Sequence, residues 1–308
     1  MRLFRSYNRK SGGTRFGKER GGLLLLLFCA AALLCLLFME PGRDAGNPVE
    51  AEGALEVHFL DVGHGDSTLI LCGEYAMMID CGDDTQGVKL QSYLREQGVE
   101  KLEYLILTHP DKDHIGGAPA ILTGVPTGQV FLPDYVKGSG TEEILHETLK
   151  QKGIVPLMPE VGAVYQLGEA RFTILAPSGV YEESNNSSIA LLLRFGENTF
   201  LFTGDAEKEA ENDMVDNSRK PGLSLRADVY QVGHHGGKSS SKKKFLNAVS
   251  PAFAVISCDD QGEKENPDEE VLKRLREAGV KVRRTDMQGT IVAYSDGKNI
   301  VWNCEPYF

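Results

Sequence analysis

The segment LEYLILTHPDKDHIGG, residues 102–117, decides how this chain is interpreted. Its first seven residues form an apolar run with the length and composition of a buried β-strand. Four side chains that can bind metals follow within six residues: His109, Asp111, Asp113 and His114. Residues two apart in an extended segment share a face, so His109 and Asp111 can converge on one ion. Asp113 and His114, where the chain turns toward a short helix, can reach a second ion. The competing interpretation of this segment is a solvated turn.

Two more polar clusters follow apolar runs later in the chain. FLFTGD (200–205) ends in Asp205, and VYQVGHHGG (229–237) carries His234 and His235. Taken alone, Asp205 also suits the N-cap of a following helix, and one of two adjacent histidines often has a structural role. Ligands gathered from the ends of several strands are the usual construction of an α/β active site. Together the three clusters predict a full set of metal ligands.

Strand patterns outnumber helical patterns in the rest of the chain. Strands are expected near 55–61, 67–71, 75–80, 102–108, 170–175, 187–195, 198–203, 227–232, 252–257, 281–284, 289–294 and 298–303. Helices are expected near 87–98, 141–152, 206–216, 240–248 and 267–279, with a short one after 117. Groups of strands with interleaved helices predict an α/β fold of two sheets packed face to face and covered by helices, a four-layer αββα sandwich.

The N-terminal part differs in character from the body. Residues 1–20 hold seven basic residues and one acidic residue, and 23–39 are seventeen residues without charge or proline. A segment of this length is at the short end of what spans a bilayer, and the basic flank places the N-terminus in the cytoplasm and the body outside. We expect a cytoplasmic tail (1–20), a transmembrane anchor (21–39), a linker (40–54) and one domain (55–308). The alternative is a cleaved signal segment and a secreted body.

Composition and charge narrow the function. With 41% hydrophobic and 25% charged residues, the 308-residue chain is neither collagen, coiled coil, multi-span membrane protein nor wholly disordered. Beyond residue 20 there are 26 basic and 43 acidic residues, a formal charge of -17, which suits duplex nucleic acid poorly. The body's cysteines lack the spacing of a zinc ribbon, and one disulfide, Cys72 with Cys81 or Cys258 with Cys304, stays open.

The body resembles the metallo-β-lactamase fold, and most of all the hydrolase domain of ComEC-type competence proteins and their stand-alone relatives. The resemblance is carried, in chain order, by DVGHGDS (61–67), MIDCG (78–82), THPDKDHIGG (108–117), SNNSS (184–188), LFTGD (201–205) and VGHHGGKSS (232–240). It covers about residues 55–303. It implies an αββα sandwich, a site for one or two divalent ions, and hydrolysis of a phosphodiester or a related ester. The carboxylates among the expected ligands make manganese an alternative to zinc.

The same resemblance implies residue roles. The implied metal ligands are His109, Asp111, Asp113, His114, Asp205 as the bridging carboxylate, and His234. Asp80 would orient a ligand or the turn. From these ligands, and not from the resemblance, we expect bound ions to lower the pKa of a water to about 7 for attack on phosphorus or carbonyl carbon. Asp113 would be essential, and His235 or Lys238 would protonate the leaving group. Two departures stand out: the family often has Gln at His64, and often His-Pro where Asn266-Pro267 stands, which predicts weaker or redirected activity.

Substrate binding is expected near the second histidine cluster. Lys238, Ser239 and Ser240 precede a helix whose free N–H groups can hold an anion, although a serine cap beside solvated lysines fits equally well. Asn186 would position the site, or belong to a turn. His58 and His146 are expected to have packing or surface roles.

The expected function is a membrane-anchored, metal-dependent phosphodiesterase or nuclease, with single-stranded DNA as the leading substrate. The alternatives are a hydrolase of small extracellular esters or choline phosphodiesters, and a non-catalytic accessory module for DNA uptake.

Overall fold

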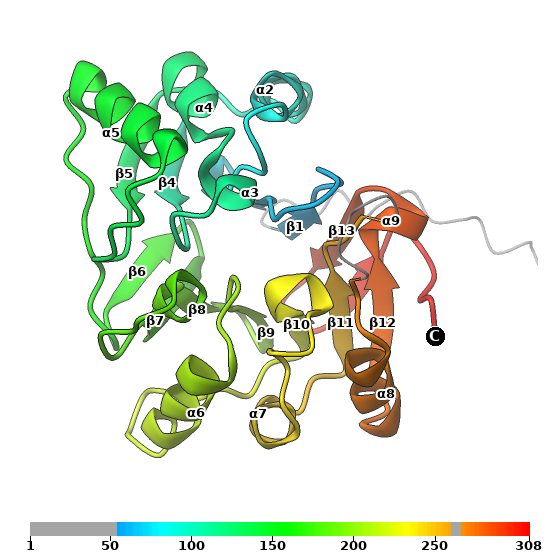
Figure 1. The fold of residues 1–308 in the computed structure, drawn as a ribbon. Helices are drawn as coiled ribbons and strands as arrows, with labels where there is room; N and C mark the ends of the chain where they lie inside the picture. The colour runs from blue at the N-terminus through cyan, green and yellow to red at the C-terminus, as the bar shows by residue number, and fades with distance from the viewer. Residues whose placement is uncertain (1–53, 260–265) are drawn as a thin grey trace, which may run out of the picture. The chain divides into compact units, whose positions relative to one another are not determined.

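The computed structural model describes residues 54–259 and 266–308, and it contains two seven-stranded sheets (Figure 1). The expected tail (1–20) and anchor (21–39) lie outside the described residues. The first sheet has the order β14 (Ile300–Trp302), β13 (Ile291–Ser295), β1 (Leu55–Phe59), β2 (Thr68–Cys72), β3 (Tyr75–Ile79), β4 (Leu102–Ile106), β5 (Thr127–Phe131). The second has the order β12 (Lys281–Arg284), β11 (Phe253–Ile256), β10 (Val229–Gln231), β9 (Asn198–Phe202), β8 (Ala190–Phe195), β7 (Ala170–Ala176), β6 (Val164–Leu167).

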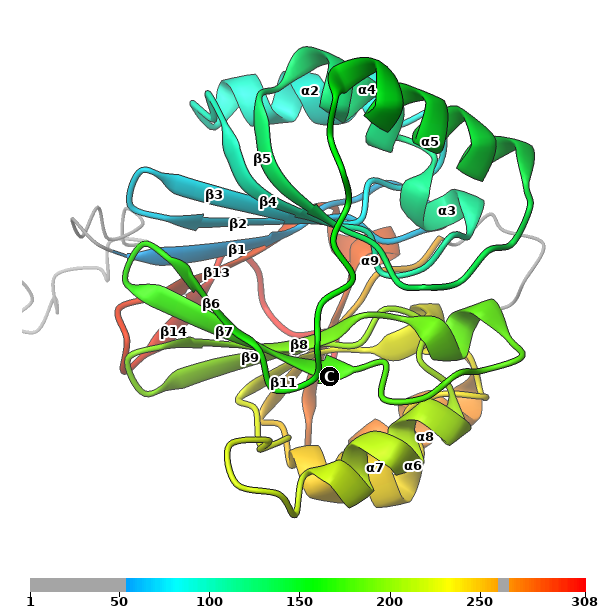
Figure 2. The same ribbon diagram turned by 90° about the vertical axis from the view of Figure 1, so that its left-hand side faces the viewer.

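Helices cover the outer face of each sheet, which gives the expected αββα layering (Figure 2). The first sheet is covered by α2 (Gly87–Glu96), α4 (Ala118–Gly124) and α5 (Gly140–Lys152), and the second by α6 (Lys208–Asn217), α7 (Lys243–Val249) and α8 (Glu269–Glu277). The shorter helices are α3 (Lys112–Ile115), α9 (Thr285–Gln288) and the 3-10 turns η1 (Ser184–Ser187) and η2 (Gly233–Gly236).

Three apolar layers hold these four layers of structure together. Strand β9 illustrates why, because Phe200 and Phe202 face the layer between the sheets while Leu201 faces the helices. A strand buried on both faces carries a continuous apolar run, which is the pattern that the sequence shows there. Leu90 of α2 and Leu145 of α5 belong to the third apolar layer, which lies between the first sheet and the helices that cover it.

Parallel strand pairs position the site. β3, β4 and β5 run parallel, as do β9, β10, β11 and β12, whereas the remaining pairs are antiparallel. Parallel neighbours need a crossover connection, and helices supply it here. The carboxyl ends of β3, β4, β9 and β10 therefore carry the connecting loops in which the polar clusters of the sequence lie.

Several expected boundaries are wrong. The strand expected from 187 begins at Ala190, because the SNNS segment before it is the 3-10 turn η1. The helix expected from 240 begins at Lys243. Strands β5 and β6 were not expected, since TGQVF and VYQL are short, half polar and at the edges of their sheets.

Two other expectations concern cysteines and membranes. Among the described residues the four cysteines are free, so neither suggested disulfide is present: Cys72, Cys81, Cys258 and Cys304. Within 54–259 and 266–308, the helices are too short or too polar to cross a bilayer.

Candidate metal centre

Three fully buried side chains, His109, His114 and Asp205, form what we call the inner group. His109 follows β4, His114 belongs to α3, and Asp205 follows β9. The Nε2 atom of His114 lies 3.4 Å from Oδ1 of Asp205, and Nε2 of His109 lies 3.8 Å from its Oδ2. The inner group thus brings together residues nearly a hundred positions apart, and all three were expected as ligands.

Asp80 positions the inner group from behind. Its Oδ2 accepts hydrogen bonds from His114 Nδ1 at 2.8 Å and from the Thr108 hydroxyl at 2.7 Å, while its Oδ1 accepts the Thr108 N–H at 2.8 Å. Because Nδ1 carries the proton in this bond, neutral His114 presents the lone pair of Nε2 to Asp205. Asp80 itself adopts a positive φ of 57°, which brings its carboxylate under the turn.

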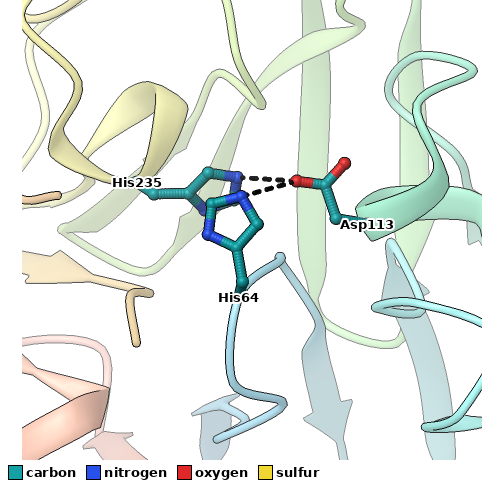
Figure 3. Close-up of side chains that lie close together, drawn as sticks. All are labelled: His64, Asp113 and His235. Carbon is teal, nitrogen blue, oxygen red and sulfur yellow. Dashed lines mark ion pairs between the residues drawn. The ribbon is translucent and has the colours of Figure 1, made fainter. Parts of the chain in front are cut away.

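The outer group consists of His64, Asp113 and His235, whose side chains converge in Figure 3. The Nε2 atoms of His64 and His235 lie 3.2 and 3.5 Å from the same oxygen, Oδ2 of Asp113. The side chain of His235 is 1% exposed, whereas those of His64 and Asp113 are 32% and 26% exposed. The outer group is therefore open to solvent on the side of His64.

The outer histidines are held by backbone contacts. His235 Nδ1 lies 3.1 Å from the carbonyl oxygen of Ser257, which can only accept, so Nδ1 carries the proton and Nε2 points to Asp113. His64 precedes Gly65, where a Cβ atom would collide with the carbonyl oxygen of Asp113. Only glycine allows that approach, so the loop after β1 rests directly on the Asp113 backbone.

Two more carboxylates approach His235: Asp205, which belongs to the inner group, and Asp66. Asp205 Oδ2 is 3.6 Å from Nε2 of His235, so this carboxylate faces both groups at once. Asp66, which is 3% exposed, has its Oδ1 3.6 Å from His235 Nδ1. Sequence reasoning assigned no role to Asp66, although it lies in the quoted DVGHGDS motif as a carboxylate just before a strand.

The donor atoms fit a metal ion. Of the nine buried side-chain atoms that lack a hydrogen-bond partner in the described part of the chain, five belong to this site: Nε2 of His109, His114 and His235, and Oδ1 of Asp66 and Asp205. Buried polar atoms without partners are costly, and imidazole and carboxylate lone pairs aimed at one another repel unless a proton or a cation lies between them. Nitrogen and oxygen donors of this kind are zinc and manganese ligands.

The charges of the metal-free centre follow from burial and from neighbouring groups. Burial, with His114 nearby, lowers the pKa of His109 to about 4, so this imidazole is neutral. Burial also acts against the charged form of His235, but Asp205 and the bond to Asp113 outweigh it and raise the pKa to about 9. The pKa of His114 is raised in the same way by Asp205 and Asp80. Cations entering this centre must therefore displace protons.

The pKa values of the carboxyl groups shift the other way. Burial opposes ionisation of Asp205, but His114 and His235 hold its pKa well below its ordinary value. The pKa of Asp113 is likewise lowered, against its burial, by bonds from His235 and His64. Both groups are thus carboxylates, the form that binds a cation.

His234 and Asp111, also expected as ligands, lie at the rim. His234 Nε2 is 3.9 Å from Asp205 Oδ2, and its Nδ1 is 3.2 Å from Glu207 Oε1. Asp111 lies 3.9 Å from His109 Nε2, and its other oxygen contacts Lys137 Nζ at 2.6 Å. Both Glu207 and Lys137 were missed: Lys137 comes from an irregular segment, and nothing in the expected helix 206–216 singles out Glu207 as the carboxylate that faces His234.

The expected anion cradle is filled by the protein. The backbone N–H groups of Ser241 and Lys242 donate to the carboxylate of Glu211. Ser240 is fully buried and donates to a backbone carbonyl, and Ser239 donates to Glu207 at 3.0 Å. The N–H groups of Ser241 and Lys242 are therefore not free to bind a substrate.

Lys238 and Asn186 differ in their surroundings. Lys238 is exposed beside the histidine loop. Asn186 is buried, and its Oδ1 accepts the N–H groups of Glu207 and Ala210 at 3.1 and 3.3 Å, which fixes the start of α6. His58 and His146 lie away from the centre, bonded to Tyr93 and close to Glu142 respectively.

The sequence also matches known proteins. Residues 60–259 match the Metallo-beta-lactamase superfamily. The chain is 30% identical over 278 residues to ComE operon protein 3 of Bacillus subtilis, covering 84% of this chain and 34% of that protein. It is 33% identical over 242 residues to Recombination protein 2 of Haemophilus influenzae, covering 77% and 28%. The chain thus spans about a third of the length of these relatives.

A solved structure shows the same fold. It is that of the metallo-beta-lactamase fold protein YhfI from Bacillus subtilis, with a TM-score of 0.55 and 13% sequence identity. The similarity covers 78% of this chain and 100% of that one.

Proposed function

The chain belongs to the metallo-beta-lactamase superfamily, and from that premise we propose that it is a metal-dependent hydrolase of phosphodiesters with single-stranded DNA as its leading substrate. The observation that carries the proposal is the convergence of unpaired imidazole and carboxylate atoms from four strand ends. The relatives named for the ComE operon and for recombination support a nucleic-acid substrate. The acidic body favours short or single strands over duplex.

The chain's own residues divide the work. We propose that the inner group holds one divalent ion, that Asp113 and His235 hold the other, and that Asp205 contributes to both, with His234 and Asp111 completing the set. Two bound ions, zinc or manganese, would supply a nucleophile at neutral pH and neutralise charge on the substrate. Asp80 keeps the inner imidazole oriented. Lys238 stays a proposed proton donor, and Lys137, whose ammonium already contacts Asp111, is a second one.

A small phosphodiester or ester is the second candidate substrate. A cavity of about 360 Å³ lies beside the metal-binding segment, lined by Pro110, Ile115, Tyr135 and Leu145 among others. Its size is within the range of small-molecule sites, and its walls are largely apolar. This cavity would hold the non-reacting part of a choline-type or aromatic ester.

The test uses the full-length chain in detergent, with bound metal quantified. Bis(p-nitrophenyl) phosphate, a phosphomonoester and labelled single- and double-stranded DNA are assayed with the wild type, with Asp113→Asn and with Asp216→Asn as a surface control. Cleavage of diester and single strand that is lost only in Asp113→Asn supports the proposal. Metal binding without turnover on any substrate supports the accessory module, as does the Asn266 that stands where the resembled family often has His.

We also propose that residues 21–39 anchor the chain in the membrane with the catalytic domain outside the cell. The basic flank and the uncharged segment support this placement. Fractionated membranes should keep the protein through a carbonate wash, and its N-terminus should precede residue 21. Release by the wash, or an N-terminus beyond Met39, would favour the secreted alternative.

A further inference from the structure

We infer that His64 is a direct ligand of the outer ion, so that two imidazoles and one carboxylate hold it. The inference rests on the proposed function and deepens it, because it adds a ligand that the motifs of the sequence do not assign. The observation behind it is the convergence of His64 Nε2 and His235 Nε2 on one oxygen of Asp113 (Figure 3).

Two of the three distances between the donor atoms match those around one tetrahedral ion, and all three atoms lie within 4.8 Å of one another. Zinc lies about 2.0–2.1 Å from an imidazole nitrogen and about 2.0–2.2 Å from a carboxylate oxygen, so neighbouring ligand atoms are roughly 3.3–3.5 Å apart. The distances from Asp113 Oδ2 to His64 Nε2 and His235 Nε2 are 3.2 and 3.5 Å. An ion can therefore bind among the three atoms with little movement of the side chains.

Tautomer chemistry shows how neutral His235 can bind an ion there. Since His235 Nδ1 donates to the Ser257 carbonyl, Nε2 of neutral His235 has a lone pair and no proton. That lone pair faces the lone pairs of the Asp113 carboxylate, an unfavourable arrangement unless a cation or a proton lies between them. His64 brings a second nitrogen to the same point, with its ring centroid 4.7 Å from that of His235.

The backbone around His64 keeps it in place. Gly63 and Gly65 on either side have positive φ values of 72° and 133°, and the N–H of Asp66 donates to the Asp113 carbonyl at 3.3 Å. The His64 loop and the Asp113 turn are thus bonded through their main chains. Their side chains meet because of this contact.

The outer group keeps one side open, as a catalytic site requires. Catalytic zinc sites commonly have three protein ligands and a fourth position for water or substrate. The partial exposure of His64 and Asp113 leaves room for that fourth ligand. With two nitrogen donors, the outer position should prefer zinc over manganese.

The experiment compares the wild type with His64→Gln, and with His146→Gln as a matched control on an exposed helix, all as full-length chains. Zinc affinity is measured by competition with a chromophoric chelator, and ligand geometry by the visible spectrum of the cobalt-loaded protein. Loss of a ligating imidazole should weaken one of two zinc ions at least tenfold, as much as losing an outer-shell partner does, and leave the other unchanged. The His146 variant should match the wild type.

A second variant guards against misfolding. In His64→Ala, added imidazole should restore zinc affinity and the cobalt spectrum, which a merely structural role of His64 would not allow. Two zinc ions of wild-type affinity and an unchanged cobalt spectrum in His64→Gln would overturn the inference while leaving the hydrolase proposal intact. A wild type that binds no metal would overturn both.

Discussion

The inner and outer groups share a carboxylate but are built differently. His109 and Asp205 follow strands of the sheets and are at most 4% exposed. His64 and His235 sit on glycine-rich loops with positive φ values, and His64 is partly open to solvent. The comparison shows that strand ends position the inner group, whereas the outer group depends on loops that are held by contacts elsewhere.

Replacing the shared carboxylate should have the largest effect. In Asp205→Asn, an amide nitrogen replaces one of the two carboxylate oxygens, and His114 and His235 lose the negative charge that faces them. We expect the affinity for both ions to fall by at least a hundredfold, which is the upper end of the effect of losing an outer-shell partner. Hydrolysis should be lost as well. Metal content after gel filtration measures this, with Asp216→Asn as control. If one ion stayed at wild-type affinity, the two groups would be independent.

The contact of Glu211 with the start of α7 can be tested through pH. Burial raises the pKa of Glu211 to about 7, although the N–H groups of Lys242 and Ser241 act to lower it. A carboxyl group with a raised pKa binds protons more tightly in the folded state. The stabilisation of the folded state by this proton binding is fully present below the unfolded pKa near 4.5 and is lost as pH rises toward 7.

Glu211→Gln should remove that dependence. Relative to the wild type, its free energy of unfolding should gain about 2–3 kcal/mol between pH 5 and pH 8, at 1.36 kcal/mol per pKa unit. Denaturant unfolding at several pH values in a chelator measures the difference, because the contributions of other groups cancel. Parallel curves for the two proteins would show that Glu211 is ionised throughout and binds the start of α7 as a carboxylate.

A smaller effect should separate the inner group from the outer. Asp80→Asn keeps the positive φ, which Asn tolerates, but removes the charge behind His114. We expect the affinity for the inner ion to fall tenfold to a hundredfold and the affinity for the outer ion to stay unchanged. Stepwise zinc titration resolves the two ions. Equal weakening of both would mean that Asp80 acts on the centre as a whole.

Much of the inner group was predictable because apolar runs end directly in its ligands. The run before His109 and the run before Asp205 are both strands, and strands of a parallel sheet deliver their ends to one edge. The two-sheet fold follows from the same alternation of strands and helices. Asp80, expected beside the turn as a carboxylate directly after a strand, contacts His114.

What could not be predicted depends on contacts between distant loops. Nothing near Ser240 in the sequence shows that Glu211, thirty residues away, fills the helix N-terminus. Lys137 reaches Asp111 from an irregular segment, and Glu207 reaches His234 from the start of α6. His64 had no assigned role because its position depends on a backbone contact and not on a pattern.

The missing side chain at Gly65 has a consequence for how the centre could change in evolution. Because the main chain there touches the carbonyl of Asp113, any larger residue would push the whole loop outward and carry His64 away from its neighbours. A substitution at a position with no chemistry of its own could thus alter which cation the proposed centre binds. The close approach of the two main chains at Gly65 and Asp113 thus sets how far apart the side chains of the outer group lie.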